Sequence, residues 1–124
     1  IVNNKEIDVV TVAIPDQQHK KVSCDLLRAG KHVLCEKPLA LTREDITEIV
    51  KVADESNAKF MVGQICRFTP AFEKSKELID SGVLGELYFV ESEYAHDYML
   101  IQEPWRCDPL RHGVIGGGCH AVDL

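Results

Sequence analysis

Three short apolar segments, separated by helix-length stretches, constrain the fold of this chain most strongly. The segments are residues 8–14, 32–35 and 60–65, and the first is almost continuously apolar and rich in β-branched side chains. This pattern is typical of strands that are buried on both faces of a parallel sheet. Residues 17–29 and the stretch that opens at Thr42 have helical periodicity. Because helical crossovers join parallel strands with right-handed connections, we expect an α/β fold with a parallel sheet.

Local signals predict where the helices begin and end. Asp16 is suited to cap the start of the first helix. Thr42 and Asp45 have the spacing of a capping box, with aspartate in place of the usual glutamate or glutamine. Gly30 and Gly82 are each expected to follow a helix C-terminus, where glycine adopts the left-handed conformation readily.

The character of the chain changes after residue 66. Thr69-Pro70 combines a cap with proline at the first helical position and predicts another helix. Residues 86–95 alternate in a way that predicts a strand with one solvated face. Residues 96–112 have little periodicity and are expected to form a loop. We therefore predict two domains, residues 1–66 and residues 67–124, the second of which begins with a more open sheet.

Both ends of the chain look interrupted. Only a few polar residues precede the first predicted strand, and no Gly-x-Gly-x-x-Gly loop occurs in the sequence. Residues 121–124 resemble the first turns of a helix. We therefore expect this chain to be part of a longer protein.

Composition and charge argue against several classes of protein. The chain has 124 residues, a formal charge of −6 and a pI near 5.3, which argue against a nucleic acid partner. No apolar run reaches the roughly 18 residues of a transmembrane helix, so no membrane partner is expected. The five cysteines are scattered and form no Cys-x-x-Cys pair. Free thiols in a reducing cytoplasm, without a metal site, are the simplest interpretation.

Glu36-Lys37-Pro38 is the first group whose residue types are suited to ligand binding or catalysis. It follows the second apolar segment, and Pro38 ends the strand because proline has a fixed φ and no N–H. Ligands bind at the carboxyl ends of strands in open parallel sheets. The acid and base would then lie at a ligand-binding edge. The alternative is an exposed ion pair on the surface, which is common and weak.

The second group lies near the end of the chain. Four glycines between residues 113 and 118 allow close approach of the backbone, and His120 follows. Histidine can act as a general acid or base, although a packed or capping histidine is the alternative. Cys35 and Cys66, at strand ends, are predicted to pack in the core as small buried thiols. Cys119 beside His120 is a weaker candidate for a nucleophile pair, because adjacent residues usually point apart.

With both groups considered together, the chain resembles the Gfo/Idh/MocA family of NAD(P)-dependent oxidoreductases. The run from Gly30 to Pro38 is the most specific part of the resemblance, and the motifs follow the order and spacing of the family. The matching residues are 8–15 with His19, 29–40, 67–70, 82–85, 105–106 and 118–124.

The resemblance implies a fold, a cofactor and partners. The fold would be the C-terminal part of a Rossmann domain, followed by the beginning of an α/β domain with an open, mainly antiparallel sheet. The cofactor would be NAD or NADP. The protein would be a homo-oligomer that transfers a hydride between this cofactor and a sugar, a polyol or a related small molecule.

The resemblance also implies roles for individual residues. Lys37 would lie beside the reacting carbinol or carbonyl, and His120 would donate or accept the proton. Glu36 would contact the nicotinamide ribose. The implied cofactor-binding residues are Pro15, His19, Glu36, Lys37, Trp105 and Arg106. The implied substrate-binding residues are Lys37, Arg67, His120 and Asp123.

One position departs from the family pattern. Many members carry an acid four residues before the histidine, where this chain has Gly116. Two functions therefore remain open: hydride transfer, and dinucleotide sensing without turnover on the same scaffold. In hydride transfer, Lys37, kept charged by Glu36, would stabilise the developing oxyanion while His120 takes the hydroxyl proton.

Overall fold

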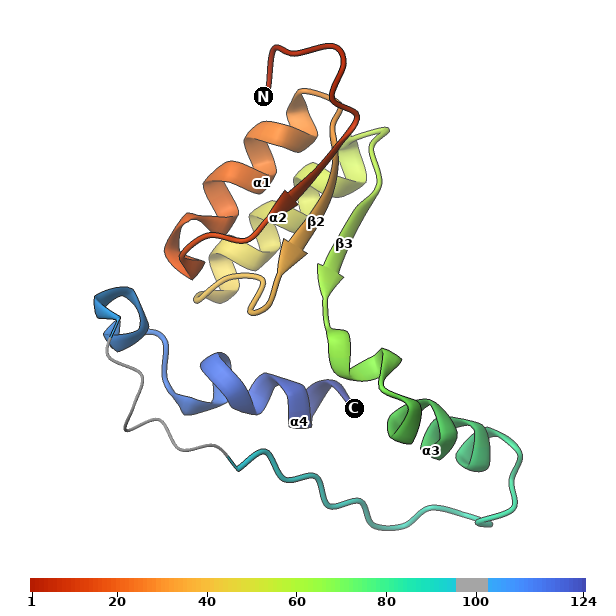
Figure 1. Cartoon of the computed structure of the whole chain (residues 1–124). Helices are drawn as coiled ribbons and strands as arrows, with labels where there is room; N and C mark the ends of the chain where they lie inside the picture. Colours follow the sequence, from red (N-terminus) through yellow and green to blue (C-terminus); the bar gives the residue numbers. More distant parts are fainter. Residues whose placement is uncertain (96–102) are drawn as a thin grey trace.

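A three-stranded parallel sheet organises the first half of the chain, in the upper part of Figure 1. The computed structural model describes residues 1–95 and 103–124. The strand order is β1-β2-β3, so the middle strand pairs with both neighbours. The predicted parallel sheet is confirmed. The strands are β1 (Val9–Val12), β2 (His32–Glu36) and β3 (Phe60–Gly63).

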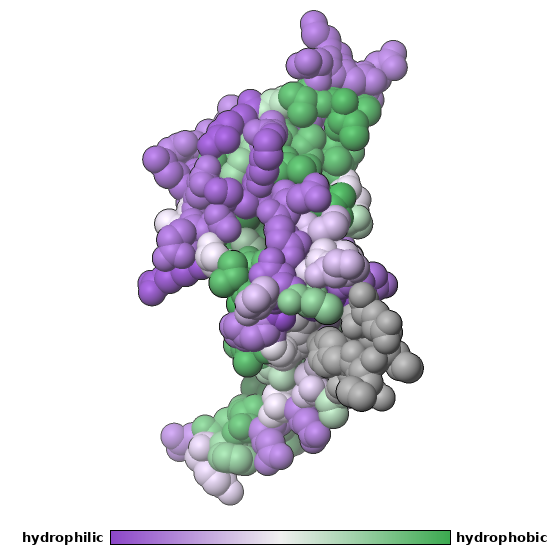
Figure 2. All heavy atoms as spheres, turned by 90° about the vertical axis from the view of Figure 1, so that its left-hand side faces the viewer, coloured by the Kyte–Doolittle hydropathy of each residue, from purple (hydrophilic) through white to green (hydrophobic). Residues whose placement is uncertain are grey.

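Two helices, α1 (His19–Arg28) and α2 (Arg43–Glu55), cover one face of the sheet (Figure 1). Each connects one strand to the next in a right-handed crossover. Because both crossovers advance in the same direction across the sheet, both helices lie on the same side. The outward side of this helical layer is mainly hydrophilic (Figure 2). The core between sheet and helices contains Val12, Cys24, Leu26, Leu27, Val33, Cys35, Ala40, Ile49 and Val52.

The opposite face of the sheet is open, so the prediction of strands buried on both faces is wrong for this chain. Val9 keeps 62% of its surface exposed and Met61 keeps 50%. Alternate residues of each strand point to opposite faces, and only one set meets the helices. The apolar sequence of the strands indicates a second covering layer that the described residues do not supply.

The predicted helix ends are largely confirmed. The Thr42 side chain accepts a hydrogen bond from the backbone N–H of Asp45 at 3.2 Å and so caps α2. Gly30 follows α1 with a φ of 75°. The cap predicted at Asp16 is wrong, because this residue lies inside a short 3-10 helix, Asp16–Gln18, and its carboxylate binds elsewhere.

The second half of the chain is more open. Helix α3 (Pro70–Asp80) begins at the predicted proline and is followed by Gly82 with a φ of 72°. The strand predicted for residues 86–95 does not form. No neighbouring strand within the described residues pairs with this segment, and Tyr88 is 98% exposed. The predicted antiparallel sheet is therefore not seen in the part of the chain that the structure describes.

The last segment returns to the carboxyl ends of the strands (Figure 1). It contains a 3-10 helix, Pro104–Cys107, then a π-helical stretch, Val114–Gly118, and α4 (Cys119–Asp123). The loop predicted for residues 96–112 falls partly outside the described residues. This return brings the glycine-rich run beside Glu36-Lys37-Pro38.

Candidate functional site

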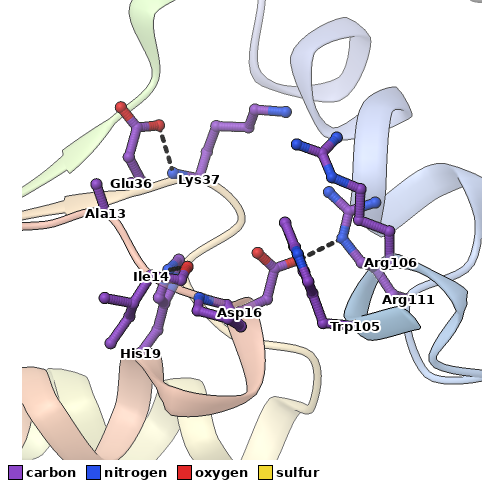
Figure 3. A pocket seen from close by; sticks show the side chains of 10 residues that line it. Ala13, Ile14, Asp16, His19, Glu36, Lys37, Trp105, Arg106 and Arg111 are labelled. Carbon is purple, nitrogen blue, oxygen red and sulfur yellow. Dashed lines mark hydrogen bonds and ion pairs between the residues drawn. The ribbon is translucent and has the colours of Figure 1, made fainter. Parts of the chain in front are cut away.

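A cavity of about 370 Å³ lies between the carboxyl ends of the strands and the returning segment (Figure 3). All six residues that the family resemblance implied for cofactor binding line it, although they come from three distant parts of the chain. The six are Pro15, His19, Glu36, Lys37, Trp105 and Arg106. The structure thus brings the whole predicted set together.

Lys37 extends from the end of β2 toward the returning segment (Figure 3). Its ammonium donates a hydrogen bond to the backbone carbonyl of Gly116 at 3.2 Å. The Glu36 carboxylate accepts a hydrogen bond from the backbone N–H of Lys37, also at 3.2 Å, and not from its ammonium. Lys37 therefore joins the two predicted groups of residues through its own side chain. Among the described residues, these two contacts take the place of the Glu36–Lys37 ion pair that was the alternative interpretation.

A buried ion pair that the sequence did not reveal closes one side of the cavity. The Arg111 guanidinium donates a hydrogen bond to the Asp16 carboxylate, with the two side chains only 6% and 4% exposed (Figure 3). The guanidinium carbon also lies 5.3 Å from the centroid of the Trp105 ring. No motif marks Arg111, and it is 95 residues away from Asp16 in the chain.

Gln17 fixes the returning segment from the same side. Its amide donates hydrogen bonds to the Trp105 carbonyl and to the Asp108 carboxylate, each at 2.9 Å. The bond from Gln17 is the main cause that holds the pKa of Asp108 below its ordinary value. Asp16 and Gln17 therefore both bind the segment that carries Trp105.

Arg111 also occupies the space beside Gly116. A Cβ at position 116 would lie 2.6 Å from the Arg111 Nη1. Real Cβ atoms do not approach so closely, so an acid at this position would require Arg111 to move. The glycine at position 116 therefore leaves the space that Arg111 uses to pair with Asp16.

His19 is fully buried and connects two loops at the sheet edge. Its Nδ1 lies 2.8 Å from the Pro38 carbonyl and its Nε2 lies 2.9 Å from the Ile14 carbonyl. Two carbonyl acceptors require two N–H donors, which only the imidazolium form supplies. Burial alone would lower the pKa of His19. The Cys35 side chain and the two carbonyls outweigh burial and raise the pKa to about 9.

His120 lies on α4 and is only 6% exposed. Its Nδ1 lies 3.3 Å from the Sγ of Cys66, and its ring centroid lies 5.2 Å from that of Tyr94. Burial and then the Lys37 charge lower its pKa below the ordinary value, against the opposing charges of Asp123 and Glu36. The prediction that Cys66 packs in the core is wrong, because this half-buried thiol contacts the candidate proton-transfer residue instead. His120 itself does not line the cavity that holds Lys37.

Arg67 and Asp123 bind each other and do not line the cavity that contains Lys37. Both Asp123 oxygens accept hydrogen bonds from the Arg67 guanidinium, at 2.7 Å each. The Arg67 hydrogen bonds are the main cause that holds the pKa of Asp123 below its ordinary value. The pair connects α4 to the 3-10 helix after β3, Ile65–Phe68, so the structure separates it from the predicted substrate contacts of Lys37.

The described ranges, 1–95 and 103–124, contain no disulfide bond. All five cysteines are free, and no cluster of three or more potential metal ligands occurs there. Within the same ranges, the helices are too short or too polar to span a bilayer.

Two family models match the chain, one in each half. The first, described as an oxidoreductase family with an NAD-binding Rossmann fold, matches residues 1–64. The second, described as the GFO/IDH/MocA C-terminal domain, matches residues 72–124.

Named relatives are similar over much of this chain. Levoglucosan dehydrogenase of Pseudarthrobacter phenanthrenivorans is 32% identical over 137 residues, covering 100% of this chain and 33% of the relative. The 2,7-anhydro-N-acetylneuraminate hydratase of Escherichia coli is 39% identical over 87 residues, covering 70% of this chain and 23% of the relative. The chain therefore spans a third or less of the length of these proteins.

Solved structures agree with the fold. An NAD binding oxidoreductase from Klebsiella pneumoniae matches with a TM-score of 0.88 and 29% identity, over 98% of this chain and 34% of that one. A levoglucosan dehydrogenase complex with NADH and levoglucosan matches with a TM-score of 0.67 and 35% identity, over 69% of this chain and 23% of that one. The family model for the NAD-binding Rossmann fold matches residues 1–64, more than half of the chain, and the parallel sheet agrees with that fold. The chain therefore belongs to the Gfo/Idh/MocA family of oxidoreductases.

Proposed function

We propose that this chain supplies the nicotinamide end of the cofactor site and the proton-transfer residues of an NAD(P)-dependent oxidoreductase. The substrate class is a sugar, a polyol or a related small molecule with a hydroxyl or carbonyl group. One observation carries the proposal: six residues from three parts of the chain converge on one cavity at the carboxyl ends of parallel strands. Ligands of open α/β sheets bind at this edge.

The lining of the cavity fits one end of a dinucleotide. Its volume, about 370 Å³, lies near the lower end of the range of about 300–1,000 Å³ for small-molecule sites, so it suits part of the cofactor. Within residues 1–95 and 103–124, the Glu36 carboxylate accepts a hydrogen bond through one oxygen only, which leaves the other for ribose hydroxyls, and the Trp105 ring provides a flat apolar wall. The bound cofactor supplies the hydride donor or acceptor.

Lys37 and His120 provide the remaining chemistry of alcohol oxidation. The Lys37 ammonium, turned toward the returning segment, stabilises negative charge on the reacting oxygen. His120 accepts the proton from the substrate hydroxyl as the hydride leaves the carbon. Its lowered pKa keeps the imidazole neutral near pH 7, which is the form that accepts a proton. In the reverse direction, the imidazolium returns the proton to the carbonyl oxygen.

Hydride transfer by the complete protein tests this proposal. The assay follows NADH or NADPH formation over a panel of sugars and polyols, with product masses to distinguish oxidation from hydration. The expected result is cofactor reduction with a subset of the panel. Tight cofactor binding without turnover on any compound would contradict the proposal.

Gly116 favours a second candidate, a dinucleotide-sensing protein without turnover. The position lacks the usual acid, and Arg111 fills the adjacent space. A sensor would bind NADH and NAD⁺ with clearly different affinities and would reduce no cofactor. Titration of both forms, alongside the turnover assay, separates the two candidates.

The same proposal includes the organisation of the protein. Residues 1–66 belong to the dinucleotide-binding domain and residues 67–124 begin the substrate domain, which the family-model boundaries support. We propose a homo-oligomer, as the family resemblance implies, in a reducing cytoplasm, which the five free thiols support. Light scattering measures the oligomeric state.

A further inference from the structure

Cys66 contacts the candidate proton-transfer histidine directly. It lies in the 3-10 helix Ile65–Phe68, immediately after β3 and 54 residues before His120. The Sγ–Nδ1 distance of 3.3 Å is within hydrogen-bond range for sulfur. This contact occupies one of the two ring nitrogens of His120, whose side chain is nearly buried.

The carboxylates near His120 are committed to other groups. Both oxygens of Asp123 bind Arg67, and Glu36 binds the backbone of Lys37. Position 116, where many family members carry an acid, is a glycine beside Arg111. Within residues 1–95 and 103–124, no carboxylate hydrogen-bonds the ring of His120.

We propose that Cys66 is the positioning residue of His120 and takes the place of a carboxylate. This inference rests on the proposed function. The Nδ1–H of His120 donates to the Cys66 Sγ, which fixes the ring orientation and leaves the lone pair on Nε2. In alcohol oxidation, that lone pair takes the hydroxyl proton while the hydride passes to NAD(P)⁺, so His120 becomes imidazolium and the substrate becomes a carbonyl.

A thiol and a carboxylate support a histidine differently. A carboxylate stabilises the imidazolium form, whereas a neutral thiol is only a weak hydrogen-bond partner. Cys66 therefore fixes the tautomer without raising the basicity of His120. The lowered pKa of His120 agrees with this arrangement. The groups that act on His120 are Cys66 after β3, Glu36 at the end of β2, Lys37 just after it, Tyr94 by ring contact, and Asp123 on its own helix.

Nitrogen NMR of ¹⁵N-histidine-labelled chain tests the tautomer without any assay of activity. In the unmodified chain and in Cys66→Ser, we expect His120 to carry its proton on Nδ1. In Cys66→Ala, we expect a mixture of the two tautomers. Cys119→Ser is the matched control, since it alters the neighbouring cysteine and should leave the tautomer unchanged. An Nε2–H tautomer in the unmodified chain, or an unchanged tautomer in Cys66→Ala, would overturn the inference.

Kinetics of the complete protein tests the consequence for proton transfer. Loss of a partner that orients a metal-bound histidine costs about 10- to 100-fold in activity, and by analogy Cys66→Ala should lower kcat by about that amount with little change in KM. Cys66→Ser should restore most of the loss, and Cys66→Asp should move the acid limb of the pH–kcat profile to higher pH. A normal kcat and pH profile in Cys66→Ala would contradict the inference and leave the proposed function intact. Absence of turnover in the unmodified protein would contradict only the proposed function, and the tautomer measurement would still decide the role of Cys66.

Discussion

The two halves of the chain use apolar residues in different ways. In residues 1–66, strands and helices pack against each other and bury a core that includes Ile49 and Cys35, each 0% exposed. In residues 67–124, α3 buries none of its residues and the apolar positions of residues 86–95 remain largely exposed. The first half buries the helix-facing side of its sheet within itself and leaves the other face open, whereas the second half buries little of its apolar pattern. The candidate site lies where the two halves meet.

A pair of truncations gives the largest effect that separates the halves. Ile49→Ala, in the buried face of α2, should lower the free energy of unfolding by about 2–5 kcal/mol, the usual cost of a cavity in a core. Phe72→Ala in α3 should cost less than about 1 kcal/mol, because that side chain is 40% exposed. Urea denaturation of both variants measures the difference. Equal losses would show that α3 is as tightly packed as α2.

The pH dependence of stability tests the junction at His19. Because the folded state raises the pKa of His19 from 6.5 to about 9, this histidine stabilises the fold fully below pH 6.5. That contribution is lost as the pH rises from 6.5 through 9. At 1.36 kcal/mol per pKa unit, the loss amounts to up to about 3 kcal/mol.

His19→Gln is the matched variant for this titration. Urea denaturation at about pH 6, 7, 8 and 9 should show that the free energy of unfolding of the unmodified chain falls as the pH rises. The variant should be less stable at pH 6 and nearly constant across the range. The same decline in both proteins would mean that another group causes it.

Lys37→Ala tests the part of the site that both halves share. Loss of one preorganised donor costs about 10²-fold or more in kcat, equivalent to about 2.7 kcal/mol, and we expect at least that loss in the complete protein. Lys21→Ala, which alters an exposed lysine of α1, is the control. A near-normal kcat in Lys37→Ala would exclude Lys37 from the chemistry.

The fold of the first half could be predicted because its signals are local. Apolar segments, Gly30 and the Thr42 cap each act over a few residues, and the structure contains the parallel sheet that they indicate. The strand predicted for residues 86–95 failed for the opposite reason. A strand requires hydrogen bonds to a neighbour, and alternation along one segment does not show whether that neighbour is present.

The residues of the candidate site also divide into those with local sequence signals and those that depend on contacts between distant parts of the chain. Glu36-Lys37-Pro38 and the glycine-rich run could be identified from their residue types and from the family resemblance. The Asp16–Arg111 pair and the Cys66–His120 contact could not, because each joins residues more than 50 positions apart without a motif. Only the folded chain shows that Arg111 occupies the space beside Gly116.

Fluorescence of Trp105 tests most directly whether the two halves form one cofactor site. Trp105 is the only tryptophan in this chain and lines the same cavity as Lys37. NADH added to the complete protein should quench Trp105 emission and gain emission by energy transfer, and both changes should diminish in Trp105→Phe at equal NADH occupancy. NADH binding that leaves the same fluorescence changes in Trp105→Phe would contradict the account, because it would place the nicotinamide away from the returning segment.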